Sequence, residues 1–423
     1  MIELHKDVIR FSFPAIAAEL EDLIEGYIHS LLPSFLAEER EVAVEQFLDK
    51  SRALCSSLEY QTEVRKVASE LSNADIETSF RKVVAGFTKA YGYNKPGRME
   101  IEFQRTLRIP DDGGSYPLPP GLGRFPLRHL EDYGDRVPPD WLKRGGIIMA
   151  MYQAEALWLN FRGQYPMAIK IGAGKINAVT GELWQAGLNR EPQDYVVVPD
   201  QPWLDGFAVE KGIIRQFVAM PLGTGYSVEE QLSGRAEFGG IQLQVHPLKA
   251  SVFFDEEIRH LLPKRLADIL PDVMPKWKYR RADYSVECCM AESSGMGLGA
   301  GGRMRQQIYA DPFSSEDWET SQTSRCFVHL CNALVWREMT GENPPQTPVT
   351  AKEYERARLP WFDFYRDDLA ILEGSKALAS VLSVATIAKI KEGQPMLGND
   401  SVAIPSVISC VTTSKEVTEW SGE

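Results

Sequence analysis

The sequence predicts an α+β fold: a large antiparallel β core, sandwich or barrel-like, with a helical insertion between its first two strands and helices at its C-terminal end. Three observations support this prediction. Short strand-like segments separated by turn residues recur from residue 147 onward. A strand pattern near the start is interrupted by helical periodicity and resumes at Met99. The 423 residues are 44% apolar and 25% charged, which is ordinary globular composition.

The first predicted strand, residues 8–13, alternates on a period of two and stops at Pro14. From residue 15 the apolar positions repeat at helical spacing, beginning with Leu20, Leu23, Ile24, Tyr27 and Leu31. About four helices are expected before the strand pattern returns, with Ile101, Phe103, Leu107 and Ile109 on one face. We therefore interpret residues 15–97 as an insertion between two strands that would otherwise follow one another.

Further strands are predicted at 147–152, 156–161, 167–171, 195–198, 213–220 and 241–246. This cadence is typical of a sandwich or barrel rather than of alternating strands and helices. Helices are expected at 256–270 and 326–339, and Thr350 with Glu353 forms a capping box that opens another. The predicted domains are a discontinuous β core (1–14 and 98–349), the inserted helical module (15–97), and C-terminal helices and a tail packing on the core (350–423).

Composition narrows the class of protein. A net charge of -13 repels phosphate backbones, so a nucleic-acid partner is not expected. Six cysteines lack the spacing of a disulfide framework, and the first residues carry no apolar signal segment, which favours a soluble cytoplasmic protein. The apolar stretch 377–388 is shorter than the roughly 20 residues that span a bilayer, so no membrane association is expected.

Several longer segments resemble a family of uncharacterised proteins of bacteria and fungi. They are PLPPGLGRFPL (117–127), MYQAEALWLNF (151–161), DYVVVPDQPWLDGF (194–207), IRQFVAMPLGTGY (214–226), GLGAGGRMRQQIYADP (297–312) and LPWFDFY (359–365). The resemblance covers residues 1–13 and about 98–423. It implies that the first strand ordinarily runs directly into the second, so that this chain departs from the pattern through its insertion. It implies no activity and no catalytic residue.

The sharpest local motif is a glycine run, residues 295–302, which contains G-x-G-x-x-G. A dinucleotide-binding fingerprint needs a full helix after the glycines, whereas the residues that follow alternate like a strand. Two interpretations remain: a flexible, closely packed turn, or a loop whose backbone amides bind an anion. The candidate ligand-binding residues of the second interpretation are Gly299, Gly301, Gly302, Arg303 and Arg305.

Three further candidate ligand-binding residues are Arg215, Glu287 and Trp203. In an extended chain Arg303 and Arg305 share one face, and Arg215 lies in another predicted strand. An acid such as Glu287 would have to converge with them in a cleft, whereas a solvated sheet face explains the same pattern without any ligand. Trp203 stands beside a carboxylate, as do the aromatic residues of segment 359–365. Such pairs suit stacking on a sugar or gripping a cation, and they equally suit core packing.

No metal or cofactor is expected. Cys326, His329 and Cys331 follow one another closely, with Cys288 and Cys289 upstream, but paired C-x2-C knuckles are missing. Buried cysteines and a helical histidine are the favoured explanation. Cys326 lacks an activating context for a nucleophile, and no catalytic residue can be named.

Two functions remain open. The first is a protein, with or without enzymatic activity, that binds a polar or anionic small molecule around Arg215, Glu287, Arg303 and Arg305. The second is a non-catalytic scaffold that presents its acidic helical module, with 14 acidic and 8 basic residues between Ala15 and Gly92, to a protein partner or to itself. The first is favoured because polar stripes flank the glycine run.

Overall fold

The computed structural model describes residues 1–37, 97–258 and 295–412, except 367, 395, 397, 398, 400, 405 and 406. Contacts divide the chain into two compact units. The first comprises Met1–Phe11, Met99–His246 and Asp283–Glu423, and the second comprises Ser12–Arg98 and Pro247–Ala282. The β-sheets belong to the first unit.

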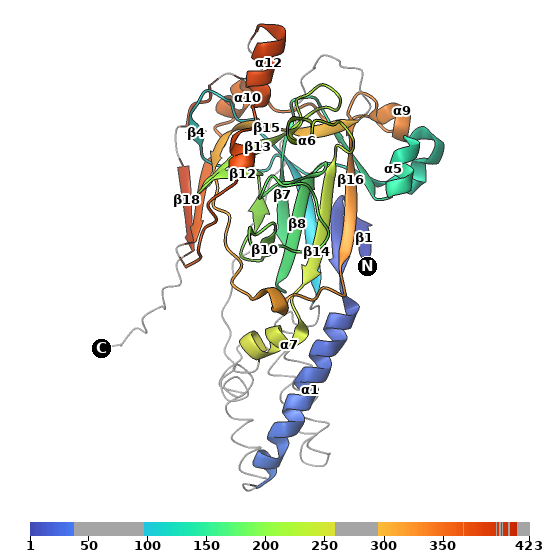
Figure 1. The fold of residues 1–423 in the computed structure, drawn as a ribbon, viewed down its shortest axis with the longest axis vertical. Coiled ribbons are helices and arrows are strands. Elements are labelled where there is room, and N and C mark those ends of the chain that lie inside the picture. The colour runs from blue at the N-terminus through green and yellow to red at the C-terminus, as the bar shows by residue number, and fades with distance from the viewer. Residues whose placement is uncertain are drawn as a thin grey trace, which may run out of the picture. The chain divides into compact units, whose positions relative to one another are not determined.

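The first unit is β-rich and contains two large mixed sheets (Figure 1). In the first sheet the described strands run in the order β1 (Ile2–His5), β2 (Val8–Ser12), β3 (Arg98–Thr106), β7 (Ala156–Arg162), β13 (Ile213–Pro221), β15 (Met296–Arg305) and β4 (Ser115–Tyr116). Two short strands extend it: β11 (Trp203–Leu204) pairs with β7, and β12 (Gly206–Glu210) pairs with β13. The adjacency of β2 and β3 brings together two strands that the predicted insertion separates in the sequence.

The second sheet has the order β10 (Val196–Val198), β8 (Met167–Ala173), β14 (Ile241–Pro247), β16 (Ser324–Asn332), β6 (Ile147–Met151) and β5 (Leu127–His129), with β9 (Ile176–Asn177) beside β8. A small parallel pair is formed by β17 (Trp361–Arg366) and β18 (Val407–Thr412). The pairs β16–β6 and β15–β4 are also parallel, so the antiparallel prediction needs correction to mixed sheets. Neither large sheet closes into a barrel over the part of the chain that is described.

The strand predictions are confirmed, because each expected segment lies in a strand of one of the two sheets. The second sheet's β6 and β8 consist entirely of buried residues, including Lys170 of β8. In β3 the side chains of Met99, Ile101 and Phe103 are fully buried, in agreement with their alternation in the sequence.

The predicted helix at 326–339 is wrong over most of its length. Residues Ser324–Asn332 form β16, which pairs with both β14 and β6, and only Trp336–Thr340 is helical (α9). A short apolar run fits a buried strand as well as a helix, and pairing on both sides decided the outcome. His329 is therefore a strand residue.

The C-terminal region contains helices, as predicted, and also strands. The capping box of Thr350 and Glu353 is confirmed at the start of α10 (Ala351–Arg356). The aromatic segment 361–366 forms strand β17. Further short helical elements of this unit are η1 (Leu130–Arg136), α5 (Pro139–Arg144), α6 (Val228–Ser233), η3 (Ser315–Asp317), α11 (Lys376–Ala379) and α12 (Val384–Glu392).

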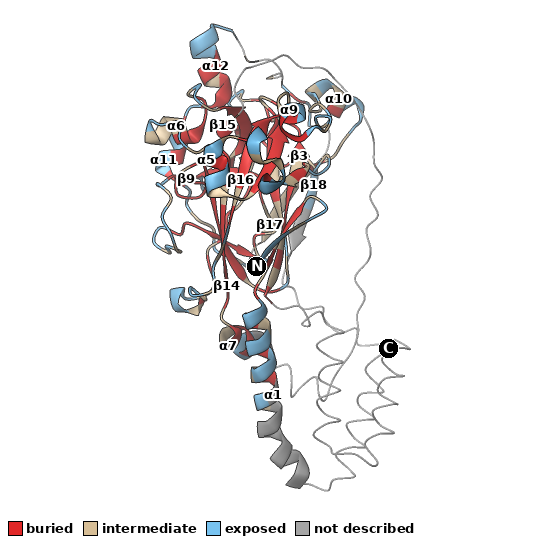
Figure 2. Cartoon of the chain, turned by 90° about the vertical axis from the view of Figure 1, so that its right-hand side faces the viewer, coloured by how far each residue is buried: buried red, intermediate tan, exposed pale blue. Residues whose placement is uncertain are grey.

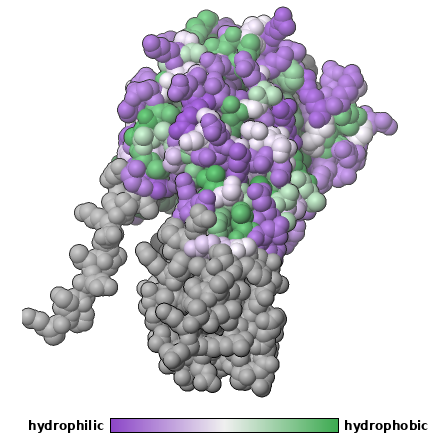
Figure 3. All heavy atoms as spheres, turned by 60° about the horizontal axis from the view of Figure 1, so that its bottom comes forward, coloured by the Kyte–Doolittle hydropathy of each residue, from purple (hydrophilic) through white to green (hydrophobic). Residues whose placement is uncertain are grey.

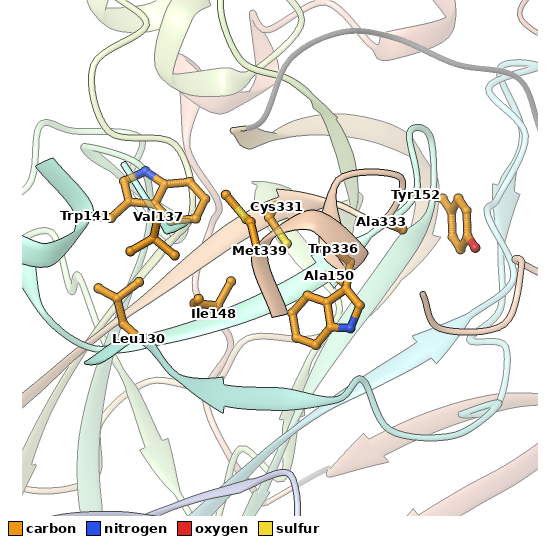
Figure 4. Packing of buried hydrophobic residues seen from close by; sticks show 10 residues of the cluster. All are labelled: Leu130, Val137, Trp141, Ile148, Ala150, Tyr152, Cys331, Ala333, Trp336 and Met339. Carbon is orange, nitrogen blue, oxygen red and sulfur yellow. The ribbon is translucent and has the colours of Figure 1, made fainter. Parts of the chain in front are cut away.

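Buried residues concentrate on the strands of the first unit (Figure 2). One apolar cluster joins the second sheet to the helices beside it (Figure 4). Ile148 and Ala150 of β6 and Cys331 of β16 meet Trp141 of α5 and Trp336 of α9 there. A second cluster packs α12 onto the first sheet, through Ala156, Val218, Met220, Val384 and Ile387. Burial of such side chains contributes about 1.5–3 kcal/mol each.

The second unit contains the helix α1 (Pro14–Ala37), the short helix α7 (Ala250–Phe253) and one π-helical turn, η2 (Phe254–Ile258). Tyr27 of α1 packs edge-on against Phe254, with ring centroids 5.6 Å apart. The first helix expected after the opening strand is thus present. Residues 38–96 of the predicted insertion and most of the helix expected at 256–270 lie outside the described residues.

Among the helices described, none combines the length and the hydrophobicity required for a membrane span. Hydrophilic and hydrophobic residues are interspersed over the coloured surface in Figure 3, without one dominant apolar patch in that view. Scattered apolar residues of this kind are normal on a protein surface.

Candidate functional site

The glycine run is a strand and not a loop, which corrects both interpretations of this motif. Gly299, Gly301 and Gly302 lie inside β15, and none of them has a positive φ. A Cβ added at Gly299 would lie 2.6 Å from the Val384 Cγ1 atom, and one at Gly302 would lie 2.3 Å from the Pro110 carbonyl oxygen. These glycines therefore let neighbouring segments approach the strand closely. Turn-type amide nests are absent from this described stretch.

The three predicted arginines do come together. Arg215 of β13 and Arg303 of β15 are direct cross-strand partners. Arg303 and Arg305 are separated by one residue, so their side chains leave β15 on the same side. Glu287, the acid expected beside them, lies outside the described residues.

Two of these arginines are held by bidentate ion pairs. The guanidinium of Arg303 donates to both carboxylate oxygens of Glu210, at 2.9 and 2.7 Å, and holds the pKa of that carboxyl below its usual range. Arg305 donates to both oxygens of Asp363, at 3.1 and 2.9 Å. An anion at either guanidinium would compete with a carboxylate that already matches its fork.

Arg215 is paired less closely. Its Nη1 atom lies 3.6 Å from Asp111 Oδ1 and donates to the carbonyl oxygen of Gly301 at 3.3 Å. Burial lowers the pKa of Arg215 from its usual value, and the Asp111 carboxylate opposes that effect. Each of the three cations in the arginine cluster therefore has its own acid.

A second arrangement lies on the same sheet, around Trp203. Three neighbouring strands place Glu102 (β3), Asn160 (β7) and Trp203 (β11) in one cross-strand row. The adjacent row pairs Gln104 with Trp158. Side chains of direct partners project from the same face of a sheet, so these residues share one face.

Glu102 is the anchor of this face. Its side chain is 4% exposed, and its carboxylate accepts hydrogen bonds from Gln104 Nε2 at 3.0 Å and Asn160 Nδ2 at 3.1 Å. Arg124 and Arg162 approach the same carboxylate at 3.4 and 3.3 Å. A buried carboxylate with several donors is held in a fixed position.

Aromatic rings flank the row. Trp203 packs against Phe364 with ring centroids 4.8 Å apart and planes inclined at 55°. Its ring also lies near that of Trp158, at 6.3 Å and 69°. All three side chains are half-buried. The two segments in which the sequence pairs aromatics with carboxylates are thus brought into contact, and we call Glu102, Gln104, Trp158, Asn160, Trp203 and Phe364 the Trp203 face.

Buried amides fix the backbone of Trp203. Its carbonyl oxygen accepts hydrogen bonds from Gln201 Nε2 at 3.0 Å and from Gln306 Nε2 at 3.3 Å. Gln306 also donates to Asp205 Oδ2 at 3.0 Å and accepts from the Asp205 N–H at 3.0 Å. Burial raises the pKa of Asp205 to about 8, and the hydrogen bond from Gln306 opposes this effect.

The cysteine and histidine residues do not form a metal centre in the described part of the chain, where no group of three or more His, Cys, Asp or Glu side chains could hold an ion. Cys326 and Cys331 are buried free thiols, and burial raises the pKa of Cys326 to about 12. His329 stacks on Trp141 at 4.7 Å, and burial lowers its pKa to about 4. The two thiols and the imidazole are therefore packed in the protein interior.

Sequence reasoning missed Glu102, Gln104, Trp158 and Asn160. Glu102 and Gln104 were recognisable as the polar side of a strand, but nothing local linked them to Trp203. That link needs the register of β3, β7 and β11.

Comparisons of this chain with protein-family models, with curated proteins and with solved structures found no match. The chemistry of the Trp203 face is therefore inferred from its own residues.

Proposed function

We propose that the protein binds a polar small molecule on the Trp203 face. The observation that carries the proposal is the cross-strand row of Glu102, Asn160 and Trp203. It sets an aromatic surface directly beside hydrogen-bonding groups. Ligand sites combine these two elements, because apolar contact supplies affinity while a few fixed polar groups supply orientation.

Rigidity supports the proposal. Glu102 is held by two amides, and the backbone of Trp203 is held by Gln201 and Gln306. Groups that are already ordered lose little conformational entropy when a ligand arrives, so more of the contact energy appears as affinity.

The arginine cluster supports an anionic ligand less well. At Arg303 an anion would have to displace Glu210, and at Arg305 it would have to displace Asp363. Glu210 is 53% exposed, so its displacement would cost less than that of Asp363, which is 14% exposed. Of the two, Arg303 is the easier position for an anion to occupy. Because Glu210 must still be displaced, we expect an anion to bind there more weakly than a polar ligand binds on the Trp203 face.

Two features support the finer architecture expected from the sequence, a sandwich with an inserted module. Each large sheet has buried strands, and β2 and β3 are sheet neighbours. Removal of residues 15–97 and closure of the gap by a short turn should leave a cooperatively unfolding protein, measured by thermal denaturation. Insolubility with every turn tried would contradict the insertion.

The ligand proposal is tested by isothermal titration calorimetry with panels of sugars, nucleosides and amino acids. One class should bind the wild type, and Trp203→Ala should weaken it by about 1–3 kcal/mol, the range for loss of a stacking ring. Trp184→Ala is the matched control, because Trp184 is also half-buried but contacts Lys170 of the second sheet. Equal affinity in the wild type and in Trp203→Ala, or no binding by any class, would overturn the proposal.

A further inference from the structure

We propose that the ligand of the Trp203 face is a neutral carbohydrate, with one pyranose ring stacked on Trp203 and its hydroxyl groups bonded to the row beside it. This inference rests on the proposed function and adds the chemical class of the ligand. It follows from the kind of hydrogen-bonding groups present, from the angles between the rings and from the charge balance.

The polar row is rich in acceptors. The amide groups of Gln104 and Asn160 donate to Glu102, and the structure gives no donor to either amide oxygen from the residues it describes. The carboxylate of Glu102 is itself an acceptor. A ligand that satisfies this row must supply donors, and sugar hydroxyls do so at adjacent carbons.

The ring angles favour a sugar over a flat heterocycle. The planes of Trp158 and Phe364 are inclined to the plane of Trp203 by 69° and 55°, so neither ring forms a parallel slot with Trp203. A flat base gains most when it stacks between or upon parallel faces. A pyranose needs only one face, because its axial C–H groups meet the negative face of a single indole.

Charges around the row balance. Three arginines and three glutamates are joined there by ion pairs. Arg10 pairs with Glu3 and Glu100, and Arg124 and Arg162 both pair with Glu102. The whole chain carries -13. Neither the local nor the overall charge therefore attracts a phosphorylated or acidic sugar.

The experiment titrates the full-length protein with glucose, galactose, mannose and their linear trisaccharides, and in parallel with adenosine and glucose 6-phosphate. Saturation-transfer NMR and calorimetry report binding. At least one neutral sugar should bind, with about tenfold weaker affinity in Trp203→Ala and a smaller loss in Asn160→Ala. Trp184→Ala should bind like the wild type.

The outcomes separate the inference from the proposed function. Trp203-dependent binding of adenosine without binding of any sugar would overturn the carbohydrate assignment and leave the ligand face standing. Tighter binding of glucose 6-phosphate than of glucose would overturn the neutral charge of the ligand. Absence of binding by every probe would overturn both. If Trp203→Ala does not fold, Trp203→Phe, which keeps a ring against Phe364, should still weaken sugar binding measurably, and unchanged affinity would count against the inference.

Discussion

Trp203 and Phe364, which come from distant segments of the chain, lie against each other with ring centroids 4.8 Å apart and planes inclined at 55°. This contact joins the two-stranded pair of β17 and β18 to the large sheet. It also connects the two segments of the first unit in which an aromatic residue neighbours a carboxylate. In the second of these segments, Asp363 precedes Phe364 and accepts a hydrogen bond from Arg305.

The contact should be measurable in a double-mutant cycle. Trp203→Ala and Phe364→Ala together should destabilise the protein by less than the sum of the single effects, with a coupling of about 0.5–1.5 kcal/mol for an inclined aromatic pair. Urea unfolding gives the four free energies. Trp203→Ala combined with Phe313→Ala is the control, since Phe313 packs on Trp318 instead. Additivity in the Trp203–Phe364 cycle would show that the rings are not coupled.

Asp205→Asn should alter the pH dependence of stability. The folded-state pKa of about 8 lies above the ordinary value of 3.8, so the folded protein binds this proton more tightly than the unfolded chain does. The free energy of unfolding should fall as pH rises from about 4 to about 8, with a slope approaching 1.4 kcal/mol per pH unit from this group. The substituted amide keeps an acceptor for Gln306 and cannot ionise, so the variant should lose less stability over this range. Parallel curves for the two proteins in chemical denaturation at pH 5, 6, 7 and 8 would refute the assignment of this slope to Asp205.

Gly299→Ala should destabilise the protein by about 1–3 kcal/mol, because the added methyl group would overlap Val384 and the carbonyl oxygen of Tyr226. Gly295→Ala, which starts the same glycine run, should cost far less, since its Cβ would lie 3.8 Å from the nearest atom, on Trp141. Thermal unfolding of the two variants compares them directly. Similar losses at both positions would argue against close packing as the reason for the glycines.

Lys170→Met should cost about 3–5 kcal/mol, because it leaves the carboxylate of Asp194 buried without its cation. Lys170 and Asp194 form an ion pair whose side chains are 2% and 8% exposed. Lys211→Met is the control, because its partner Glu373 is 79% exposed and a surface pair contributes about 0–1 kcal/mol. The measurement is guanidinium-induced unfolding monitored by circular dichroism. Equally small losses for both variants would contradict a strongly stabilising role for the buried pair.

Local patterns in the sequence located many of the strands, but they assigned the wrong secondary structure to two segments that are strands. Alternation over residues 8–13 and 99–109 located β2 and β3, and short strand-like segments between turn residues located β6 and β8. Two predictions went wrong where local signals are ambiguous. Glycines permit a turn and equally permit close packing on a strand, and the segment around His329 is short enough to suit either a helix or a strand.

By itself, the sequence determined most of the strands, but not β15 or β16, and it singled out Trp203, Arg215, Arg303 and Arg305 as candidate residues. Only the tertiary structure decided their partners. Register placed Asn160 and Glu102 beside Trp203 and put Arg215 opposite Arg303, while Glu210 and Asp363 occupied the guanidinium groups of Arg303 and Arg305. The physical reason is range: periodicity reports the side of a strand on which a residue lies, whereas strand order and register depend on the packing of the whole core.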